Sequence, residues 1–494
     1  MQSVRTAGSK LVFLDLKQAD HTLQAVCAFG KLDGTGTDDS LPAFKHFSKV
    51  VRKGDWYEVT GYAHRTASGE LSIRATALPT LLSPSLHQIP DQLHDDETRA
   101  TNRHVDMLVP HSDAIQTLRV RHLVEQHMNA FLIEDGFTKV TTPILTSGAG
   151  GAIARPFETE ATELEGQKLN LRIAPELWLK RLVVGGMEKV FEIGPAFRNE
   201  GIDATHNPEF YTCEFYEAFA TLEDLMAKTE RLLQTMAQLI TSHRSNLSNL
   251  HQTPSSFAPT PWDLNLASPF PRLEFIPTIE TALKQPLPDL SSPTATSDLL
   301  ALCSTNDVPI PSNHTLLRLL DALAAKFVEP LCDRPTFITH HPACLSPLSK
   351  HFVCERTGQT VAARAELFIA GTEYANMYEE ENSPFLQRQK FIDQLPYRAV
   401  DGEGASGRED GIDEGYLRVL EWGLPPTGGW GCGLERLAML FAGRERLGDV
   451  LPFGGLRNVV GAGRGRGGSM MMVEGKAKAK EKSKRREDEE VVHR

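Results

Sequence analysis

The stretch FRNEGIDATHNPEFYTCEFYEAFA, residues 197–220, interrupts two apolar runs with charged residues. Together with KVFEIGPA at 189–196, it forms two segments whose large apolar residues take the odd positions, joined by a short polar loop. Side chains alternate between the two faces of a β-strand, so each segment places its bulk on one face and its charges on the other. The pattern predicts an antiparallel hairpin whose charged faces coincide.

The even positions of this hairpin hold charged, aromatic or small side chains: Glu192, Gly194, Ala196, Arg198, Glu200, Glu214 and Tyr216. We expect Gly194 and Ala196 to leave space above the sheet. An ordinary half-exposed hairpin is the alternative, but its solvent face usually carries Lys, Thr and Ser. The hairpin therefore predicts the floor of a ligand site.

A second segment, ARAELFIAGTEYANMYEEEN at 363–382, sorts its residues in the same way. Apolar residues share one parity at Ala365, Leu367 and Ile369. Charged and polar residues take the other parity or follow it: Arg364, Glu366, Glu373, Asn376, Tyr378 and Glu380. Several acids converging on one sheet need a positive partner, because like charges repel. The segment predicts a site for a hard cation or a cationic substrate.

The third informative segment is GGWGCGLERLAMLFAG at 428–443, a glycine-rich turn that leads into a predicted helix. Its apolar residues recur at helical spacing, and Arg436 departs from their stripe. Taken alone, Arg436 is either an ordinary helix-surface charge or a site residue.

Length and composition bound the class of protein. A chain of 494 residues is too long for one compact core and predicts two or three domains. Hydrophobic content of 40% with 23% charged residues is typical of a globular protein, and no apolar run has the roughly 20 residues of a membrane span. Seven cysteines without a CxxC pair argue against a disulfide framework or a zinc site. We expect a reducing compartment and no membrane.

Four regions follow one another along the chain, and one of them contains an insertion. Short alternating strands at 1–85 predict a small barrel, and the charged, proline-containing range 86–112 predicts a linker. Mixed helix and strand signals run over 113–460, with a Ser/Pro-rich insertion at about 243–315. The low-complexity range 461–494 predicts a disordered tail, because it cannot bury enough apolar surface to offset chain entropy.

These segments resemble the class II aminoacyl-tRNA synthetases. FRNEG with THNPEF resembles the second motif of that class, GCGLER the third, and Pro143 in GFTKVTTPIL the first. Within the class, the chain resembles the lysyl-tRNA synthetases through GGAIARPFET, LRIAPELWLKRLVVGG, HPACLSPLSK and AELFIAGTEYANMYEEEN. The resemblance covers about 3–460. It implies an α+β fold, in which an antiparallel sheet flanked by helices follows an all-β anticodon-binding OB barrel, and it implies a homodimer.

The resemblance also implies a site for ATP and Mg²⁺. Arg198 and Arg436 would hold the α- and γ-phosphates, and with Glu200 they are the expected catalytic residues. The adenine side would meet Glu200, His206, Asn207 and Phe210. Glu366 and Glu373 would bind Mg²⁺, and Glu366 would thereby belong to the ATP site.

Lysine and tRNA(Lys) are the other implied partners. Glu176 would meet the α-ammonium of L-lysine, with Gly151 and Asn376 nearby. The ε-ammonium would meet Glu214, Tyr216 and Glu380, and Tyr378 belongs to the same pocket. In the barrel, Arg5, Phe13, Gln24 and Glu70 match positions that contact the anticodon. The residues of KLVFLDL alone also permit Phe13 to be a barrel core residue.

Some features depart from the family pattern. Glu435 stands where many relatives carry Asp, and Met377 replaces a small residue beside Asn376, which puts the shape of the lysine pocket in question. The barrel begins mid-strand compared with relatives, so we expect an incomplete start that could have held a transit peptide. The barrel region and the ending VLPFGGLRNVV resemble fungal mitochondrial enzymes, which favours the mitochondrial matrix over the cytoplasm.

Three alternatives stay open at this point. A sister synthetase for aspartate or asparagine would need a cation facing the substrate side chain, and Glu214 and Glu380 argue against it. An enzyme that lysylates a protein would have no use for an anticodon barrel. An RNA-binding pseudoenzyme would not need to retain Arg198 and Arg436 together with Glu366 and Glu373.

Overall fold

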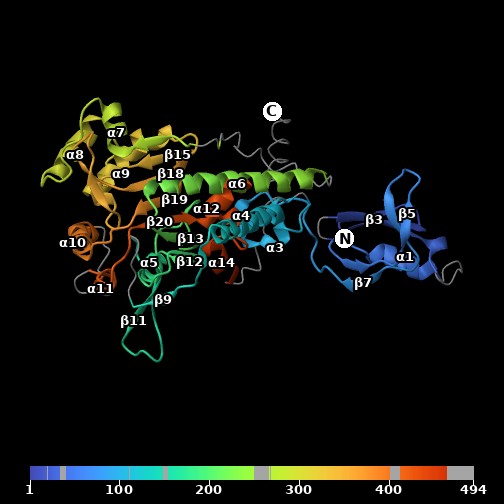
Figure 1. Cartoon of the computed structure of the whole chain (residues 1–494). Helices are drawn as coiled ribbons and strands as arrows, with labels where there is room; N and C mark the ends of the chain where they lie inside the picture. The colour runs from blue at the N-terminus through green and yellow to red at the C-terminus, as the bar shows by residue number, and fades with distance from the viewer. Residues whose placement is uncertain are drawn as a thin grey trace, which may run out of the picture. The chain divides into compact units, whose positions relative to one another are not determined.

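The computed structural model describes residues 1–18, 21–33, 41–110, 112–147, 154–249, 266, 269–400 and 412–463 (Figure 1). Gly151 and residues 464–494, for which the sequence predicts a lysine contact and a disordered tail, lie outside them. The chain forms two compact units. The first holds Met1–Ile115, Asn246–Ser256 and Asn458–Arg494, and the second holds Gln116–Ser245 and Phe257–Arg457.

The first unit is built on a five-stranded sheet in the order β1-β2-β3-β6-β5. These strands are β1 (Ser3–Thr6), β2 (Leu11–Gln18), β3 (His21–Ala28), β6 (Leu71–Ala75) and β5 (Gly61–Arg65), and a separate pair joins β4 (Trp56–Glu58) to β7 (Thr80–Ser83). The predicted β-rich region is confirmed. Ladder hydrogen bonds between the described residues do not close it into a barrel.

One face of this sheet packs on a helix that the sequence did not predict, α1 (Leu41–Val50). Val12, Leu14 and Ala25 from β2 and β3 share a core with Phe44 and Phe47 of α1. Because side chains alternate between the two faces of a strand, the odd-numbered residues of β2 must face away from this core. The range predicted as a linker also holds two short helices, α2 (Asp96–Thr101) and α3 (Arg103–Asp106).

The second unit is built on an eight-stranded sheet in the order β14-β15-β18-β19-β20-β13-β12-β8. The strands are β14 (Arg272–Glu274), β15 (Thr336–Thr339), β18 (Arg364–Ile369), β19 (Thr372–Glu379), β20 (Thr427–Gly433), β13 (Glu209–Ala218), β12 (Lys189–Phe197) and β8 (Thr138–Lys139). The six strands from β15 to β12 pair antiparallel, as predicted. The two edge strands, β14 and β8, pair parallel to their neighbours.

Three helices pack on one face of this sheet: α4 (Ala114–Glu134), α6 (Leu222–Asn249) and α12 (Leu434–Ala442) (Figure 1). Their apolar residues share a core with Phe191, Cys213 and Phe215, the odd positions of the hairpin. In the hairpin, Glu192 of β12 stands opposite Glu214 of β13. The predicted sorting of bulk to one face and charge to the other is therefore confirmed.

On the other face, three helices form a smaller core at one end: α5 (Glu176–Val184), α10 (Pro384–Val400) and α11 (Glu414–Leu420). Part of the predicted insertion, from 269 onward, folds into β14, α7 (Phe275–Leu283) and α8 (Ala295–Thr305), which share a core with α9 (Leu316–Phe327).

The remaining elements are short. They are η1 (Phe29–Lys31), β9 (Leu145–Thr146), β10 (Glu158–Glu160), β11 (Lys168–Leu171), η3 (Glu329–Leu331), η4 (Ala343–Leu345), β16 (His351–Val353), β17 (Thr360–Ala362), α13 (Leu447–Val450) and α14 (Leu456–Gly463). In the described part of the chain, every helix is too short or too polar to cross a membrane.

Candidate active site

A cavity of about 580 Å³ opens on the charged face of the central strands. The register places Glu214 on β13 opposite Gly431 on β20, and Gly431 opposite Asn376 on β19. Glu214, Gly431 and Asn376, from three neighbouring strands, therefore form one row across the floor of the cavity. The two segments that the sequence marked by their parity meet here.

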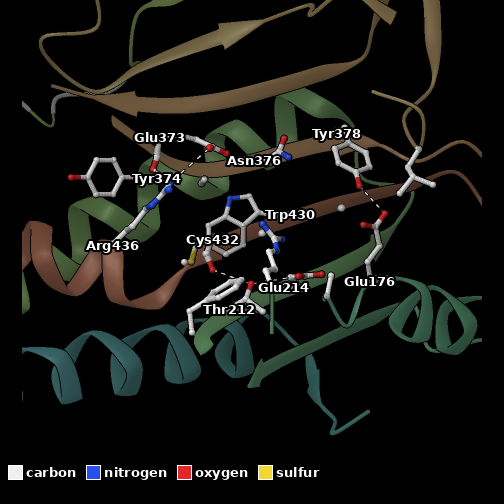
Figure 2. A pocket seen from close by; sticks show the side chains of 18 of the residues that line it. Glu176, Thr212, Glu214, Glu373, Tyr374, Asn376, Tyr378, Trp430, Cys432 and Arg436 are labelled. Atoms are coloured by element: carbon white, nitrogen blue, oxygen red, sulfur yellow. Dashed lines mark hydrogen bonds and ion pairs between the residues drawn. The ribbon is translucent and has the colours of Figure 1, made fainter. Parts of the chain in front are cut away.

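The cavity has two chemically different ends (Figure 2). Arg436 and Glu373 lie at one, the arginine end; Glu176 and Tyr378 lie at the other, the acid end; and Glu214 lies between them. Further predicted residues also line the cavity: Arg198, Glu200, His206, Asn207, Phe210, Tyr216 and Asn376. Neither Glu366 nor Glu380 is among the residues that line the cavity, and Glu380 is fully buried.

Glycines on β20 create the space above the floor. Gly429, Gly431 and Gly433 take alternate positions on the cavity face, paired with Tyr216, Glu214 and Thr212. A Cβ added to Gly429 would overlap the carboxylate of Glu380 and come within 2.7 Å of the Tyr216 ring. At Gly433 the nearest atom would be 3.8 Å away, which is ordinary contact.

The space predicted above Gly194 is not part of the site, and this prediction is wrong. The guanidinium of Arg172 fills it, 2.6 Å from where a Cβ would stand on Gly194. Arg172 Nη1 pairs with Glu192 Oε1 at 2.6 Å, and Glu192 Oε2 accepts a hydrogen bond from the Thr142 backbone at 3.0 Å. Both side chains of the pair are 2% exposed. Glu192 therefore belongs to a buried structural pair and not to the ligand floor.

Hydroxyl groups hold the carboxylates of the acid end. The Tyr378 hydroxyl donates to Glu176 Oε1 at 2.7 Å. Glu214 accepts longer hydrogen bonds from Tyr216 at 3.3 Å and from Thr212 at 3.4 Å. Among the described residues, Glu214 forms no ion pair.

Burial raises the pKa of Glu214 to about 8, and the neighbouring charge of Glu176 adds to the effect. A buried carboxylate without a cation holds its proton more tightly, because the charged form loses hydration and meets a like charge. An ammonium group that entered this end would offset both the lost hydration and the repulsion between the like charges. The acid end therefore suits a cationic ligand.

Glu380 lies behind the acid end with no exposed surface. It forms an ion pair with Lys180 of α5, whose Nζ also lies 2.5 Å from Glu176 Oε1. Burial alone would lower the pKa of Lys180, but the charges of Glu176 and Glu380 outweigh it and raise this pKa. Direct contact of Glu380 with a substrate stays a prediction.

Two arginines and an aromatic ring form the arginine end. The Arg198 guanidinium stands 5.1 Å from the centroid of Phe210. Arg436 lies in the first turn of α12, where the helix N-terminus favours anions. Its Nη1 donates to the Glu373 carbonyl at 3.0 Å, and Nη2 lies 3.2 Å from His206 Nε2. This end suits a polyphosphate with an aromatic base.

Glu366 and Glu373 differ in their surroundings. Burial alone would raise the pKa of Glu366, but Arg364 and His341 outweigh it and bring this pKa to about 2. His341 Nε2 lies 3.0 Å from Glu366 Oε2. Burial and the charge of Glu366 raise the pKa of Glu373 to about 7. Two interacting carboxylates beside a phosphate-binding end fit Mg²⁺, which uses one or two carboxylates with substrate phosphates and water.

Two predicted amides already have protein partners. Asn376 Oδ1 accepts a hydrogen bond from Arg364 Nε at 3.0 Å. Asn207 Nδ2 donates to the Glu209 carbonyl at 2.6 Å, and its Oδ1 accepts from the Leu456 backbone at 2.9 Å. Asn207 thus ties the loop of the hairpin to the first residue of α14.

The two departures from the family pattern have structural explanations. Glu435 is buried, pairs with Arg121 of α4 at 3.2 Å and accepts a hydrogen bond from the Tyr211 backbone at 3.0 Å. Met377 is fully buried on the helix-covered face of β19, where Thr229 lies 3.7 Å from its sulfur. Met377 therefore does not line the cavity and cannot shape it directly.

The four predicted anticodon residues lie together on one side of the first unit. Arg5 pairs with Phe13 in register and stands 5.8 Å from its ring centroid. Gln24 Nε2 donates to Glu70 Oε2 at 3.2 Å. Phe13 is half-buried and lies outside the core formed by Val12 and its neighbours. The alternative that Phe13 is a core residue is therefore not supported.

Three polar residues of the site were missed in the sequence, Arg172, Lys180 and His341, and Arg364 was noted only by its parity. Lys180 had a local signal, because it follows Glu176 at the helical i,i+4 spacing. Arg172 and His341 contact Glu192 and Glu366 across long sequence separations. No local pattern points to those contacts.

The comparisons with known proteins now place the chain. The family described as class II tRNA synthetases (D, K and N) matches residues 95–457, and the chain belongs to this family. A mitochondrial lysine--tRNA ligase of Schizosaccharomyces pombe is 39% identical over 93% of this chain and 83% of its own. That of Saccharomyces cerevisiae is 37% identical, over 92% and 80%. A lysine--tRNA ligase of Enterococcus faecalis is 36% identical, over 85% and 79%. Within the class, the chain is a lysine--tRNA ligase.

Proposed function

We propose that the cavity activates L-lysine with ATP to lysyl-adenylate, which then passes lysine to tRNA(Lys). The observation that carries this assignment is Glu214, a buried carboxylate without a cation, at the acid end of a cavity whose other end holds Arg198 and Arg436. A dicationic amino acid and a polyanionic nucleotide would complement the two ends.

Lysine would bind at the acid end. Glu176 would take its α-ammonium, with Asn376 and the glycine at 151 nearby. Glu214 and Tyr216 would take the ε-ammonium, together with Glu380 and Tyr378. Charged hydrogen bonds of this kind are among the stronger ones in proteins, so neutral amino acids of similar length would bind much more weakly.

ATP would bind at the arginine end. Arg198 and Arg436 would hold the α- and γ-phosphates, Phe210 would stack on adenine, and further contacts would come from Glu200, His206 and Asn207. The lysine carboxylate attacks the α-phosphorus in line, and pyrophosphate leaves. Since no protein nucleophile is required, catalysis consists of positioning and of stabilising the phosphate charge.

Glu366 and Glu373 would hold Mg²⁺. When bound, the ion would offset the negative charge of the phosphates. The chain's own residues prepare this site: Arg364 and His341 keep Glu366 ionised, and Glu373 stands beside Arg436 at 3.6 Å.

The first unit would bind the anticodon of tRNA(Lys) as an OB fold. Arg5, Phe13, Gln24 and Glu70 share one side of its sheet, where an aromatic ring and hydrogen-bonding groups stand together. Single-stranded RNA is commonly read by stacking on such rings and by bonds to base edges.

We also propose a homodimer, built through α4 and the segment around Pro143, and a place in the mitochondrial matrix. The relatives from Schizosaccharomyces pombe and Saccharomyces cerevisiae carry mitochondrial names, which supports the compartment. Sedimentation of the purified protein and its location in fractionated cells would check the two points. A monomer at micromolar concentration, or a solely cytoplasmic location, would contradict them.

One assay tests the function itself. ATP–pyrophosphate exchange, run with each amino acid in turn, should respond strongly to lysine and to no other. Exchange that is equal with aspartate and lysine would refute the substrate assignment.

A further inference from the structure

Lys180 is an ammonium group enclosed behind the acid end. Its side chain has no exposed surface, and its Nζ contacts two of the three acids in this region. It lies 2.5 Å from Glu176 Oε1 and forms an ion pair with Glu380 Oε2. Neither the predicted roles nor the comparisons assign it a function.

Three aromatic rings complete the enclosure. Lys180 Nζ lies 5.7 Å from the ring centroids of Tyr216, Tyr378 and Tyr416. A desolvated ammonium is attracted to aromatic faces, so the rings help to fix its position. Tyr216 and Tyr378 also line the cavity, which means that Lys180 stands directly behind its wall (Figure 2 labels Tyr378 and Glu176 there).

Lys180 contacts one carboxylate oxygen on each of two acids. Glu176 Oε1 is shared by Lys180 and the Tyr378 hydroxyl, and among the described residues its Oε2 has no hydrogen-bond donor. Glu380 Oε1 lies against the backbone of Gly429, so close that a Cβ added to Gly429 would overlap this oxygen. Lys180 therefore contacts one carboxylate oxygen of each acid, and the second oxygen of each acid makes no contact with it.

The charges at this end also match a diammonium ligand. Glu176, Glu214 and Glu380 contribute three carboxylates, and Lys180 contributes one ammonium. With all three carboxylates ionised, two negative charges remain, which is the number that the α- and ε-ammonium groups of lysine would neutralise. Without Lys180, three carboxylates would share one desolvated region, and protons would compete with the substrate for them.

We propose that Lys180 is a positioning residue for lysine: it holds Glu176 and Glu380 in place and sets the unbalanced charge of the acid end at two. The inference rests on the proposed lysine pocket and adds the residue that organises it. Lys180 does not contact the substrate or the reacting atoms.

The test is the Lys180→Met variant in ATP–pyrophosphate exchange. The KM for lysine should rise at least about tenfold, because its acids lose their fixed partner, whereas the KM for ATP should stay within about twofold. The Lys180→Arg variant, which keeps a cation between the acids, should recover much of the loss. Should Lys180→Met not fold, Lys180→Gln, which keeps a hydrogen-bond donor, should show the same selective rise.

A second buried pair provides the matched control. Lys390 Nζ stands 2.6 Å from Glu381 Oε2, and neither residue lines the cavity. Lys390→Met should lower the melting temperature and leave the KM for lysine within about twofold. If the KM for lysine changes no more in Lys180→Met than in Lys390→Met, the proposal fails. It also fails if Lys180→Arg, with a parental melting temperature, binds lysine as poorly as Lys180→Met. Failure of the function would look different: no lysine-dependent exchange in the parent protein.

Discussion

At the scale of single residues, the properties of Glu214 come from its surroundings. It is buried beside Glu176, and hydroxyl groups are its only hydrogen-bond donors among the described residues. The cost of keeping a charge there is recovered when an ammonium group arrives. The carboxylate is thus better suited to a bound cation than to the empty site, and this difference is the physical basis of substrate choice.

Replacing Glu214 by glutamine should therefore weaken lysine activation selectively. We expect Glu214→Gln to lose about 2 kcal/mol or more of transition-state stabilisation, as for a broken charged hydrogen bond. The measurement is kcat/KM for lysine in exchange, with the KM for ATP as the internal control. An unchanged kcat/KM for lysine would contradict the role of Glu214.

The raised pKa of Glu214 predicts a pH dependence with a definite sign. With a pKa of about 8 in the empty site, this carboxyl holds a proton at neutral pH, and an incoming ammonium must displace it. The KM for lysine should therefore fall as pH rises toward about 8 and level off above it. Glu214→Gln should lack this dependence. A parental KM for lysine that is flat between pH 6 and 8 would rule out the shift.

Glu366 and Arg436 should be required at the arginine end. Glu366→Ala removes a carboxylate that Arg364 and His341 keep ionised, and Arg436→Ala removes the cation at the start of α12. Neither variant should form the adenylate, because the negative charge of the pyrophosphate group loses either the Mg²⁺ held by Glu366 or the cation of Arg436. Single-turnover formation of lysyl-adenylate is the measurement, and a parental rate in either variant would refute the assignment.

At the scale of elements, strand β20 makes room for the acids of its neighbours. Its alternate glycines lie opposite Glu214 and Tyr216 on β13, so the chain approaches those side chains closely. Alternation along a strand made the charged face predictable. The position of β20 between β13 and β19 was not predictable, because its partner strands are distant in sequence and glycine shows no alternation of apolar and polar side chains.

Gly429→Ala should disable the acid end. The added methyl group would overlap Glu380 and press on Tyr216, so the KM for lysine should rise at least about tenfold. Gly433→Ala, on the same strand and face, meets only ordinary contacts and should leave the KM for lysine near the parental value. Equal effects of the two substitutions would point to a general loss of strand geometry.

At the scale of the whole molecule, the two compact units suggest separable tasks. Phe13→Ala should leave exchange intact and weaken aminoacylation by roughly 1–3 kcal/mol, the worth of one base stack. Phe44→Ala, in the core of the same unit, is the control and should lower the melting temperature. Impaired charging with unchanged stability, relieved by more tRNA, supports the RNA contact. A melting temperature that falls as far as in Phe44→Ala would support a core role.

The sequence by itself determined the hairpin, the sorting of its residues between two faces, and the charged residues at both ends of the cavity. It could do so because strand alternation and helical spacing are local properties of the chain. Only the tertiary structure decided that Arg172 fills the space above Gly194, that Met377 lies on the far face, and that Lys180 pairs with Glu380. These outcomes depend on burial and on contacts between distant segments, where a charge must find a partner that no local pattern specifies.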